Sequence, residues 1–435
     1  MSGALIERVF AREILDSRGR PTVESDVILD DGTVGRASVP SGASTGSHEA
    51  VELRDGEPDH YAGLGVRRAV SNVRELIGPA VRGLPCAEQA LLDTRLIELD
   101  GTPNKSRLGA NALLSVSLAA CRAAALSARV PLYQHIATIA EVAQPTIPLP
   151  MVNIVSGGLH AGGQIEIQDV LAIPIGASTF AQALEWAWRV HRAAGERVRR
   201  EGHPPLVADE GGWAPPLTSN EQALQWVTDA IEAAGLQPGR DVSLAIDVAS
   251  THFLEPGTEQ YVLPHEQRRL SGTEMVEMLV TWRSRYPLVS IEDGLAENDW
   301  TSWRALTDRL GPNTQLVGDD LFTTDVSRVE RGIRDGAANA VLVKVNQIGT
   351  ITEALRVVAR AREVGWRSVA SARSGETEDA FLSDFAVGCA ADQVKVGSVT
   401  RSSRLAKWNQ LLRIEEELPD AYLGAAGLDP NVRQR

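Results

Sequence analysis

The sequence predicts an α/β fold in which a large (β/α)8 barrel follows a smaller α+β domain. Between residues 243 and 397, short apolar runs recur, and each ends in an acid, a lysine or a small polar residue. A helical stretch of roughly 15 residues follows most runs, which is the pattern of parallel βα units. The first 140 residues differ, because strands come first there and helices follow. We therefore expect a capping domain over 1–140, a barrel over 146–418 and a C-terminal tail over 419–435.

The N-terminal domain is predicted to open with a sheet. Residues 5–39 alternate between apolar and polar side chains, with a turn signal at Asp30-Asp31-Gly32. This pattern indicates an antiparallel hairpin or a three-stranded meander. Helical patterns follow at 66–77, 86–99 and 109–128. The stretch 41–46 consists of small residues, and its chemistry alone favours a plain linker.

The barrel is predicted to start after a proline-rich boundary. Three prolines between residues 145 and 150 favour an extended connector. A glycine-rich loop with His160 follows, and then a strand that carries Asp169. Glu210 stands in an Asp-Glu-Gly-Gly run, a composition suited to a tight turn at the rim of a site. The chain beyond Leu418, rich in Pro, Gly and Arg, is expected to be frayed.

Polar residues close the apolar runs at nearly regular intervals. The four intervals from Glu292 onward are 27, 25, 28 and 23 residues, about the length of one strand, one helix and two loops. An acid after a strand can simply cap the next helix. Five or six such residues in register favour a shared position instead, because the carboxyl ends of barrel strands converge on one mouth. The positions concerned are Asp247, Glu292, Asp319, Lys344, Lys395 and Ala372, the last of which stands between the polar residues Ser371 and Arg373.

Lysine is scarce in this chain. Of 43 basic residues only four are lysines (Lys105, Lys344, Lys395 and Lys407), and the other 39 are arginines. Arginine stays protonated in proteins, whereas lysine can act as a base when its surroundings lower its pKa. Two of the four lysines end predicted barrel strands, so we expect Lys344 and Lys395 to be functional. A lysine that merely extends from a strand end to solvent is the weaker interpretation.

Three acids at one mouth predict a magnesium site. Asp247, Glu292 and Asp319 would repel one another in a poorly solvated cleft, and a divalent cation relieves that repulsion. Ligand sets made only of oxygen favour Mg²⁺.

The neighbouring cationic residues predict a base and an anion site. Lys344 is suited to take a proton from the carbon next to a carboxylate whose developing charge the metal absorbs. Its pKa would have to fall by about 2–3 units, a shift that neighbouring cations can supply. Arg373, Ser374 and Lys395 are candidates for holding an anionic substrate that carries phosphate and carboxylate groups.

Composition sets limits on function. The formal charge of −14 argues against non-specific nucleic-acid binding. Three widely spaced cysteines predict neither a disulfide framework nor a zinc site. The N-terminus has no basic-then-apolar signal pattern, and the most apolar helix, near 110–126, contains polar residues that we expect to make it too polar for a membrane. These features predict a cytoplasmic protein without a nucleic-acid or membrane partner.

Eight short motifs are spread over the chain from about Val9 to Leu418. They are ILDSRG at 14–19, SGASTG at 41–46, DEGG at 209–212, SIED at 290–293, DDL at 319–321, KVNQIG at 344–349, RSGETED at 373–379 and LLRIEE at 411–416. Together they closely resemble the enolase (phosphopyruvate hydratase) family. The resemblance implies an enolase-type barrel with an α+β N-terminal domain. It also implies dehydration of 2-phosphoglycerate to phosphoenolpyruvate, two Mg²⁺ ions and a homodimer or larger homo-oligomer.

The resemblance implies ligands for both metal ions and a base. Asp247, Glu292 and Asp319 are similar to the ligands of the first Mg²⁺. Ser44, in the stretch described above as a linker, is similar to a ligand of the second Mg²⁺ on a closing lid. Lys344 corresponds to the base at C2.

The resemblance also implies the residues around the substrate. Glu210 is similar to the acid that assists departure of the C3 hydroxyl, and His160 to a mobile-loop histidine near the phosphate. Arg373 and Ser374 resemble the phosphate contacts, and Lys395 the residue that binds the carboxylate.

Four departures from the family pattern stand out. Enolases have histidine at the position of Ala372, glutamate at Asp169 and asparagine at Ser156, and residues 250–253 replace a Ser-Glu-Phe sequence. Ala372 and Asp169 fall on the leaving-group side of the substrate in the family. The proton-abstraction half of the site therefore matches, while the elimination half is altered.

Three interpretations follow. The first is a working, diverged enolase. The second is an enolase-derived enzyme of specialised metabolism with a phosphonate or phosphinate ligand, such as carboxyphosphonoenolpyruvate synthase. The third, a non-catalytic binding or scaffold protein, is disfavoured by the presence of Lys344, Lys395 and all three metal acids.

Overall fold

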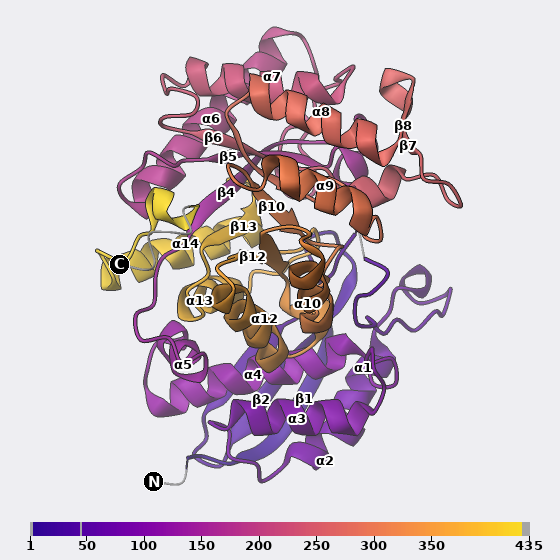
Figure 1. The fold of residues 1–435 in the computed structure, drawn as a ribbon. Coiled ribbons are helices and arrows are strands. Elements are labelled where there is room, and N and C mark those ends of the chain that lie inside the picture. Colours follow the sequence, from indigo (N-terminus) through magenta and orange to yellow (C-terminus); the bar gives the residue numbers. More distant parts are fainter. Residues whose placement is uncertain (1–2, 44–45, 429–435) are drawn as a thin grey trace.

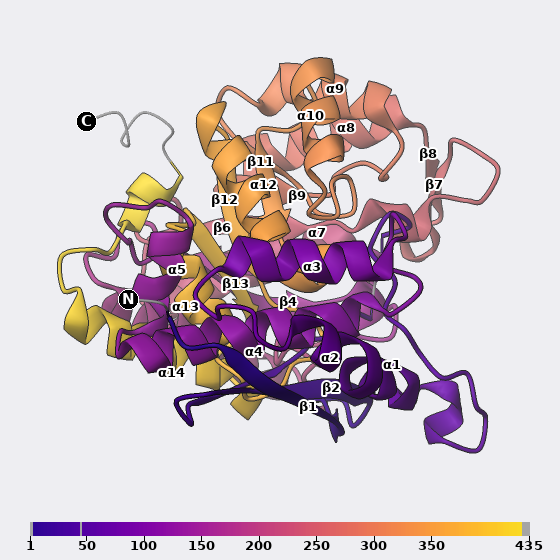
Figure 2. The same ribbon diagram turned by 90° about the horizontal axis from the view of Figure 1, so that it is seen from below.

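The computed structural model describes residues 3–43 and 46–428 of the 435-residue chain (Figure 1). The predicted fold class is confirmed, because a closed eight-stranded barrel follows a small domain with an antiparallel sheet. Figure 2 shows helices of the small domain between that sheet and the barrel. The small domain therefore reaches the barrel mainly through its helices.

The N-terminal sheet is the predicted meander. It contains β1 (Ile6–Leu15), β2 (Pro21–Leu29) and β3 (Val34–Ser38), with β2 in the centre and both pairings antiparallel. Helix α4 (Ala110–Ala128) packs on β2 and β3. A Cβ on Gly35 would lie 2.2 Å from the Ala119 carbonyl oxygen, so this close packing of helix on sheet requires glycine there.

Further helices complete the small domain. All three predicted helical stretches are helical, but a turn of π-helix interrupts the first, and a last helix was not predicted. The elements are η1 (Tyr61–Gly63), α1 (Arg67–Asn72), the π-turn η2 (Val73–Ile77), α2 (Gly78–Val81), α3 (Gln89–Asp100) and α5 (Leu132–Ile139).

The expectation that the polar residues of helix α4 make it too polar to span a membrane was wrong. By length and composition α4 could cross one, and it is the one such helix in the described part of the chain. However, 83% of its most apolar window is buried inside the protein. Its apolar side chains therefore form the core between the sheet and the barrel.

The barrel strands close in the order β4-β5-β6-β9-β10-β11-β12-β13. Every pairing is parallel except those of β5, which runs antiparallel to both β4 and β6. The bounds are β4 (Leu149–Ser156), β5 (Asp169–Ile173), β6 (Ser243–Asp247), β9 (Leu288–Glu292), β10 (Gln315–Gly318), β11 (Ala340–Val343), β12 (Arg367–Ser371) and β13 (Gln393–Gly397).

Helices and short elements surround the barrel. A two-stranded sheet projects between β6 and β9; it consists of β7 (Tyr261–Leu263) and β8 (Arg268–Leu270). The helices are α6 (Phe180–Arg200), α7 (Asn220–Ala233), α8 (Gly272–Arg285), α9 (Trp300–Leu310), α10 (Val326–Asp335), α11 (Val345–Ile348), α12 (Ile351–Glu363), α13 (Phe381–Gly388) and α14 (Ser402–Glu417). Single 3-10 turns are η3 (Gly158–His160), η4 (Ser250–Phe253), η5 (Pro264–Glu266) and η6 (Gly424–Gly427).

The reversed direction of β5 decides where Asp169 lies. Asp169 is the first residue of β5, and it pairs with Ser156 at the end of β4 and with Asp247 at the end of β6. The start of an antiparallel strand lies at the same edge as the ends of its neighbours. Asp169 therefore reaches the mouth although it begins a strand.

Apolar side chains fill the inside of the barrel, so a site can form only at its mouth. This inner core consists of Leu149, Met151, Leu171, Ile173, Ala245, Val317, Ala340, Leu342 and Val369. The segment after Leu418 closes the opposite end, where Ile147 donates its N–H to Ala421 O over 2.9 Å. The expectation of a frayed tail was therefore wrong for residues 419–428, and residues 429–435 lie outside the described part.

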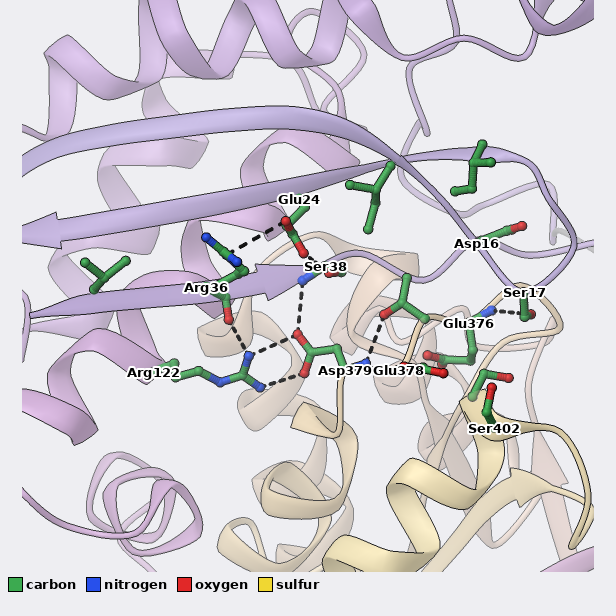
Figure 3. A pocket seen from close by; sticks show the side chains of 15 residues that line it. Asp16, Ser17, Glu24, Arg36, Ser38, Arg122, Glu376, Glu378, Asp379 and Ser402 are labelled. Carbon is green, nitrogen blue, oxygen red and sulfur yellow. Dashed lines mark hydrogen bonds and ion pairs between the residues drawn. The ribbon is translucent and has the colours of Figure 1, made fainter.

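The small domain and the mouth loops meet along a polar seam. Ser41 and Gly375 exchange two backbone hydrogen bonds of 2.8 and 2.9 Å. Arg122 of α4 forms an ion pair of 2.6 Å with Asp379, and Figure 3 shows this pair beside the sheet. The segment after residue 46 also contacts the mouth, where Ala50 donates its N–H to Gln347 O over 2.8 Å. Within the 41–46 stretch Ser41 and Gly46 are buried while Ala43 is exposed, so the linker interpretation is wrong for Ser41 and Gly46, and residues 44–45 lie outside the described part.

Candidate active site

Three predicted acids and both predicted functional lysines meet at the mouth. Lys395, on β13, places Nζ 2.6 Å from Asp247 Oδ2 and 2.8 Å from Glu292 Oε2. Lys344, directly after β11, places Nζ 2.5 Å from Asp319 Oδ2. All five side chains are nearly buried, with exposed fractions between 1% and 7%. The strand ends therefore converge as the spacing predicted.

Glu292 is the least satisfied of the three acids. Its Oε1 is buried and has no hydrogen-bond partner among the residues that the structure describes. Burial, followed by the negative charge of Asp247, raises the pKa of Glu292 well above its ordinary value. For Asp247 burial acts in the same direction, but Lys395 outweighs it and lowers the pKa. One carboxylate oxygen at the mouth thus remains open to a further positive charge.

Lys344 is held by Asp319 rather than prepared as a neutral amine. Burial lowers the pKa of Lys344, but the Asp319 carboxylate outweighs it, so the pKa lies above its ordinary value. The expected fall is therefore not produced by the protein's own groups. Gln347 completes the arrangement, because its side-chain amide donates to Asp319 Oδ1 over 2.8 Å.

A second acidic group lies beside the first. Asp293, Asp319 and Asp320 offer ligand oxygens that all lie within 4.8 Å of one another. Asp293 accepts the backbone N–H groups of Asp319 and Asp320 over 2.9 and 2.8 Å. Burial and the Asp319 charge raise the pKa of Asp320 to about 8. Asp319 thus belongs to two groups of acids at once.

His160, Asp169 and Glu210 form the opposite side of the mouth. Their ligand atoms also lie within 4.8 Å of one another, and His160 Nδ1 is 3.0 Å from Asp169 Oδ2. Burial lowers the pKa of His160, but the negative charges of Asp169 and Glu210 outweigh burial, so the pKa is raised. Burial raises the pKa of Glu210, but the positive charges of Arg404 and His160 outweigh burial, so the pKa is lowered. This side therefore combines an imidazole that favours its proton with a carboxyl group that favours its charge.

One cavity joins most of the predicted residues. Asp169, Glu292 and Asp319 lie directly behind this lining through their contacts with His160, Lys395 and Lys344. The lining consists of His160, Gln168, Glu210, Asp247, Lys344, Ser371, Ala372, Arg373, Ser374 and Lys395.

Arg373 is bound by a carboxylate of the small domain. Its Nη1 and Nη2 lie 3.0 and 3.1 Å from the two carboxylate oxygens of Glu49. Ser374 accepts a hydrogen bond of 3.1 Å from Arg18, which also comes from the small domain. Ser44, the predicted ligand of a second metal ion, lies outside the described residues.

Sequence reasoning missed several polar residues of the mouth. Gln168 donates to Asp247 Oδ2 over 3.1 Å and Gln347 donates to Asp319, yet neither amide carries charge that a pattern could single out. Glu49 was missed too, although it follows the small-residue stretch by only three positions. Gln347 and Asp320 stand in the motifs KVNQIG and DDL, and these motifs could have identified them as residues of the mouth.

A larger cavity of about 650 Å³ lies elsewhere, at the seam between the N-terminal sheet and the 376–379 loop (Figure 3). Its lining contains none of the predicted site residues. The predicted site residues are thus gathered around the smaller cavity at the mouth.

Two family models cover almost the whole chain. One, described as "Enolase, N-terminal domain", matches residues 6–136, and the other, described as "Enolase, C-terminal TIM barrel domain", matches residues 144–428. The chain belongs to the enolase family. A curated relative named Enolase, from Acidothermus cellulolyticus (strain ATCC 43068 / DSM 8971 / 11B), is 52% identical over 425 residues, which is 97% of both chains.

Membership in the enolase family confirms the predicted resemblance and the predicted enzyme class. The chain is a phosphopyruvate hydratase-like lyase. The interpretation as a non-catalytic scaffold is accordingly set aside.

Proposed function

We propose that this lyase dehydrates 2-phosphoglycerate to phosphoenolpyruvate in a Mg²⁺-dependent reaction. The observation that carries the proposal is the contact of Lys344 and Lys395 with three strand-end carboxylates at the mouth of an enolase-family barrel. A small phosphorylated carboxylate fits such a mouth, because Arg373 and Ser374 line it together with the lysines.

The donor set fits Mg²⁺. Asp247, Glu292 and Asp319 supply only oxygen, and the buried Glu292 Oε1 has no hydrogen-bond partner in the described ranges 3–43 and 46–428. When bound, the ion would neutralise charge that develops on the substrate carboxylate. Ser44 is proposed as a ligand of a second ion on grounds of family resemblance alone.

Lys344 is the proposed base. It stands at the end of β11 inside the mouth cavity, where it can take a proton from C2 of a bound substrate. Asp319 holds Nζ in place at 2.5 Å, so the amine needs no reorientation before the proton moves. If Asp319 bound another cation, its carboxylate would no longer raise the pKa of Lys344.

The opposite side is proposed to handle the leaving hydroxyl. Glu210 would first take up a proton, because its lowered pKa keeps it charged before substrate binds, and would then donate that proton to the leaving hydroxyl, with Asp169 and His160 beside it. Arg373 and Ser374 would hold the phosphate, and Lys395 the carboxylate. Binding of the phosphate would have to compete with Glu49 for Arg373.

One observation favours a second candidate. Ala372 brings no polar side chain to the cavity, and Asp169 is one methylene shorter than the glutamate of the family pattern. Both features reduce the capacity of this side to expel hydroxide. The alternative function is therefore conversion of a related phosphonate or phosphinate substrate in specialised metabolism, as in carboxyphosphonoenolpyruvate synthase.

The quaternary and cellular setting is proposed from the family. We propose a homodimer or larger homo-oligomer in the cytoplasm, with a capping domain at 1–140 and a catalytic barrel that starts near 146. The acidic composition, with a formal charge of −14, supports a setting without nucleic-acid partners.

The deciding experiment follows enol absorbance after purified protein is mixed with 2-phosphoglycerate and Mg²⁺. Dehydration that EDTA abolishes supports the proposed reaction. Absence of both dehydration and C2 hydrogen exchange would overturn it and favour the second candidate.

A further inference from the structure

A buried hydrogen-bond chain leads from strand β4 to Asp169. Asn153 and Ser156 stand on β4, and neither is more than 2% exposed. The Ser156 hydroxyl donates to Asp169 Oδ1 over 2.8 Å, and the Asn153 amide donates to the same oxygen over 2.5 Å. Asn153 Nδ2 also donates to Ser156 Oγ over 2.9 Å. The other oxygen of Asp169 faces His160, so the chain ends at an imidazole that lines the mouth cavity.

The same strand end fixes the loop that carries Glu210. Trp213 donates its N–H to Ile154 O over 2.8 Å, and the Ser156 N–H donates to Trp213 O over 2.8 Å. A Cβ on Gly212 would lie 2.6 Å from both Asn153 Oδ1 and Ser156 Oγ, so the loop approaches too closely for any other residue. One end of β4 thus supports the side chains on both sides of the proposed leaving-group site.

We propose that Asn153 and Ser156 are positioning residues that fix Asp169, and through it His160, for the elimination half of the reaction. The inference rests on the proposed function, because neither side chain lines the mouth cavity. Ser156 accepts from Asn153 and donates to Asp169, so its hydroxyl limits rotation of the carboxylate. Misplacement of a catalytic group by about 1 Å can cost about 10²-fold in rate.

Steady-state kinetics of two Ser156 variants and one control test the proposal. Ser156→Ala leaves Asn153 on Asp169, so the fold is kept, and we expect kcat to fall about tenfold with KM changed less than twofold. Ser156→Thr retains the hydroxyl and should restore kcat to within about threefold of the wild type. Ser243→Ala is the matched control, because Ser243 is a buried serine at the start of β6, and its hydroxyl has no hydrogen-bond partner in the described part of the chain. Unchanged kcat in Ser156→Ala, or no recovery in Ser156→Thr, would overturn the proposal.

A measurement without substrate separates this proposal from the proposed function. In the ¹H–¹⁵N spectrum of histidine-labelled protein, the His160 ring signal is assigned by its loss in His160→Gln. We expect this signal to move in Ser156→Ala and to return in Ser156→Thr. An unmoved signal overturns the positioning role even if the enzyme is active. A shift that Ser156→Thr reverses supports that role even if 2-phosphoglycerate is not the substrate.

Discussion

Lys344 has two relationships at the mouth that a substitution can separate. Its charge pairs with Asp319 over 2.5 Å, while its proposed task is to accept a proton. Arginine can keep the first and cannot perform the second, because its guanidinium does not lose a proton in proteins.

We therefore predict that Lys344→Arg lowers turnover by about 10²–10⁴-fold while the melting temperature stays nearly unchanged. Exchange of the C2 hydrogen with solvent deuterium, followed by NMR, should vanish as well. Lys105→Arg serves as control, since Lys105 is also buried and ion-paired but lies away from the mouth cavity. Retained exchange in Lys344→Arg would place the base elsewhere.

Ala372 and Asp169 set the second residue-scale prediction. An imidazole at 372 would enter the mouth cavity, and a glutamate at 169 would reach one methylene further. We predict that Ala372→His with Asp169→Glu raises dehydration at least about tenfold, since one stabilising group is worth about 10²–10³-fold.

The single variants refine that test. Asp169→Glu alone should contribute less, because Asn153 and Ser156 are spaced for the shorter side chain. Wild-type turnover of about 10 s⁻¹ or more with 2-phosphoglycerate would contradict this account of the departures.

Charged strand-end residues could be predicted from the sequence, and neutral ones could not. Asp247, Glu292 and Lys395 stand out because a charge after an apolar run is costly unless it meets a partner. Gln168 and Asn153 form equally buried hydrogen bonds, but an amide is common enough in any loop to give no signal. The sequence also could not show that the pKa of Lys344 is raised, because this shift depends on Asp319 lying 2.5 Å from Lys344 Nζ.

At the scale of elements, the strand carrying Asp169 was predicted but its direction was not. Alternation of side chains is the same in both directions, so periodicity cannot reveal an antiparallel strand. Loop length was the usable signal: β4 ends at Ser156 and β5 starts at Asp169, which is short for a crossover that contains a helix. Likewise α5 was missed, since an eight-residue helix gives little periodic signal.

Helix α13 gives a prediction for the pH dependence of stability. Asp384 is 5% exposed, and burial raises its pKa to about 6. Since the folded pKa lies above the unfolded one, the folded state binds the extra proton, and stability falls as pH rises from about 4 to 6. Asp384→Asn should therefore raise the free energy of unfolding at pH 7.5, by up to about 2–3 kcal/mol.

Urea unfolding of wild type and Asp384→Asn at pH 4.5 and 7.5 checks this expectation. The two proteins should differ more at pH 7.5 than at pH 4.5. Equal differences at both pH values would show that the carboxyl is already neutral or adequately solvated.

At the scale of the molecule, ion pairs link the small domain to the barrel, and Arg122–Asp379 is one of them. Asp379 accepts from Arg122 over 2.6 and 3.1 Å and from the Ser38 N–H over 3.0 Å (Figure 3). Burial raises the pKa of Asp379, but Arg122 outweighs it, so the pKa is lowered and the pair contributes above the unfolded pKa.

Asp379→Ala should lower the free energy of unfolding by about 2–3 kcal/mol in urea at pH 7. The estimate is at the low end for buried pairs because Arg122 keeps 25% of its side chain exposed. The loss should shrink as pH falls below about 4, where the wild-type carboxyl also becomes neutral. A loss under about 0.5 kcal/mol would mean that other contacts hold the seam.

Metal linkage gives the last whole-molecule prediction. A ligand that binds only the folded state stabilises it by about 2.7 kcal/mol at a concentration of 100 Kd. We expect the melting temperature to rise with Mg²⁺ and to return after EDTA is added. Glu292→Gln, which removes the charge at the unsatisfied oxygen, should weaken the response. A melting temperature indifferent to Mg²⁺ and EDTA would contradict the metal assignment.

Because all four lysines are buried, the fold controls how the protein reacts with amine-modifying reagents. Lys105, Lys344, Lys395 and Lys407 are between 1% and 7% exposed, so the surface of the described residues offers no lysine amine. Acylating reagents and lysine-modifying enzymes therefore find targets only through the mouth, which Lys344 and Lys395 line. Lys105 and Lys407 are ion-paired with Glu353 and Glu376, and their amines become reachable only when the fold opens. Labelling of Lys344 and Lys395 therefore measures access to the mouth. Labelling of Lys105 and Lys407 measures unfolding in the same sample.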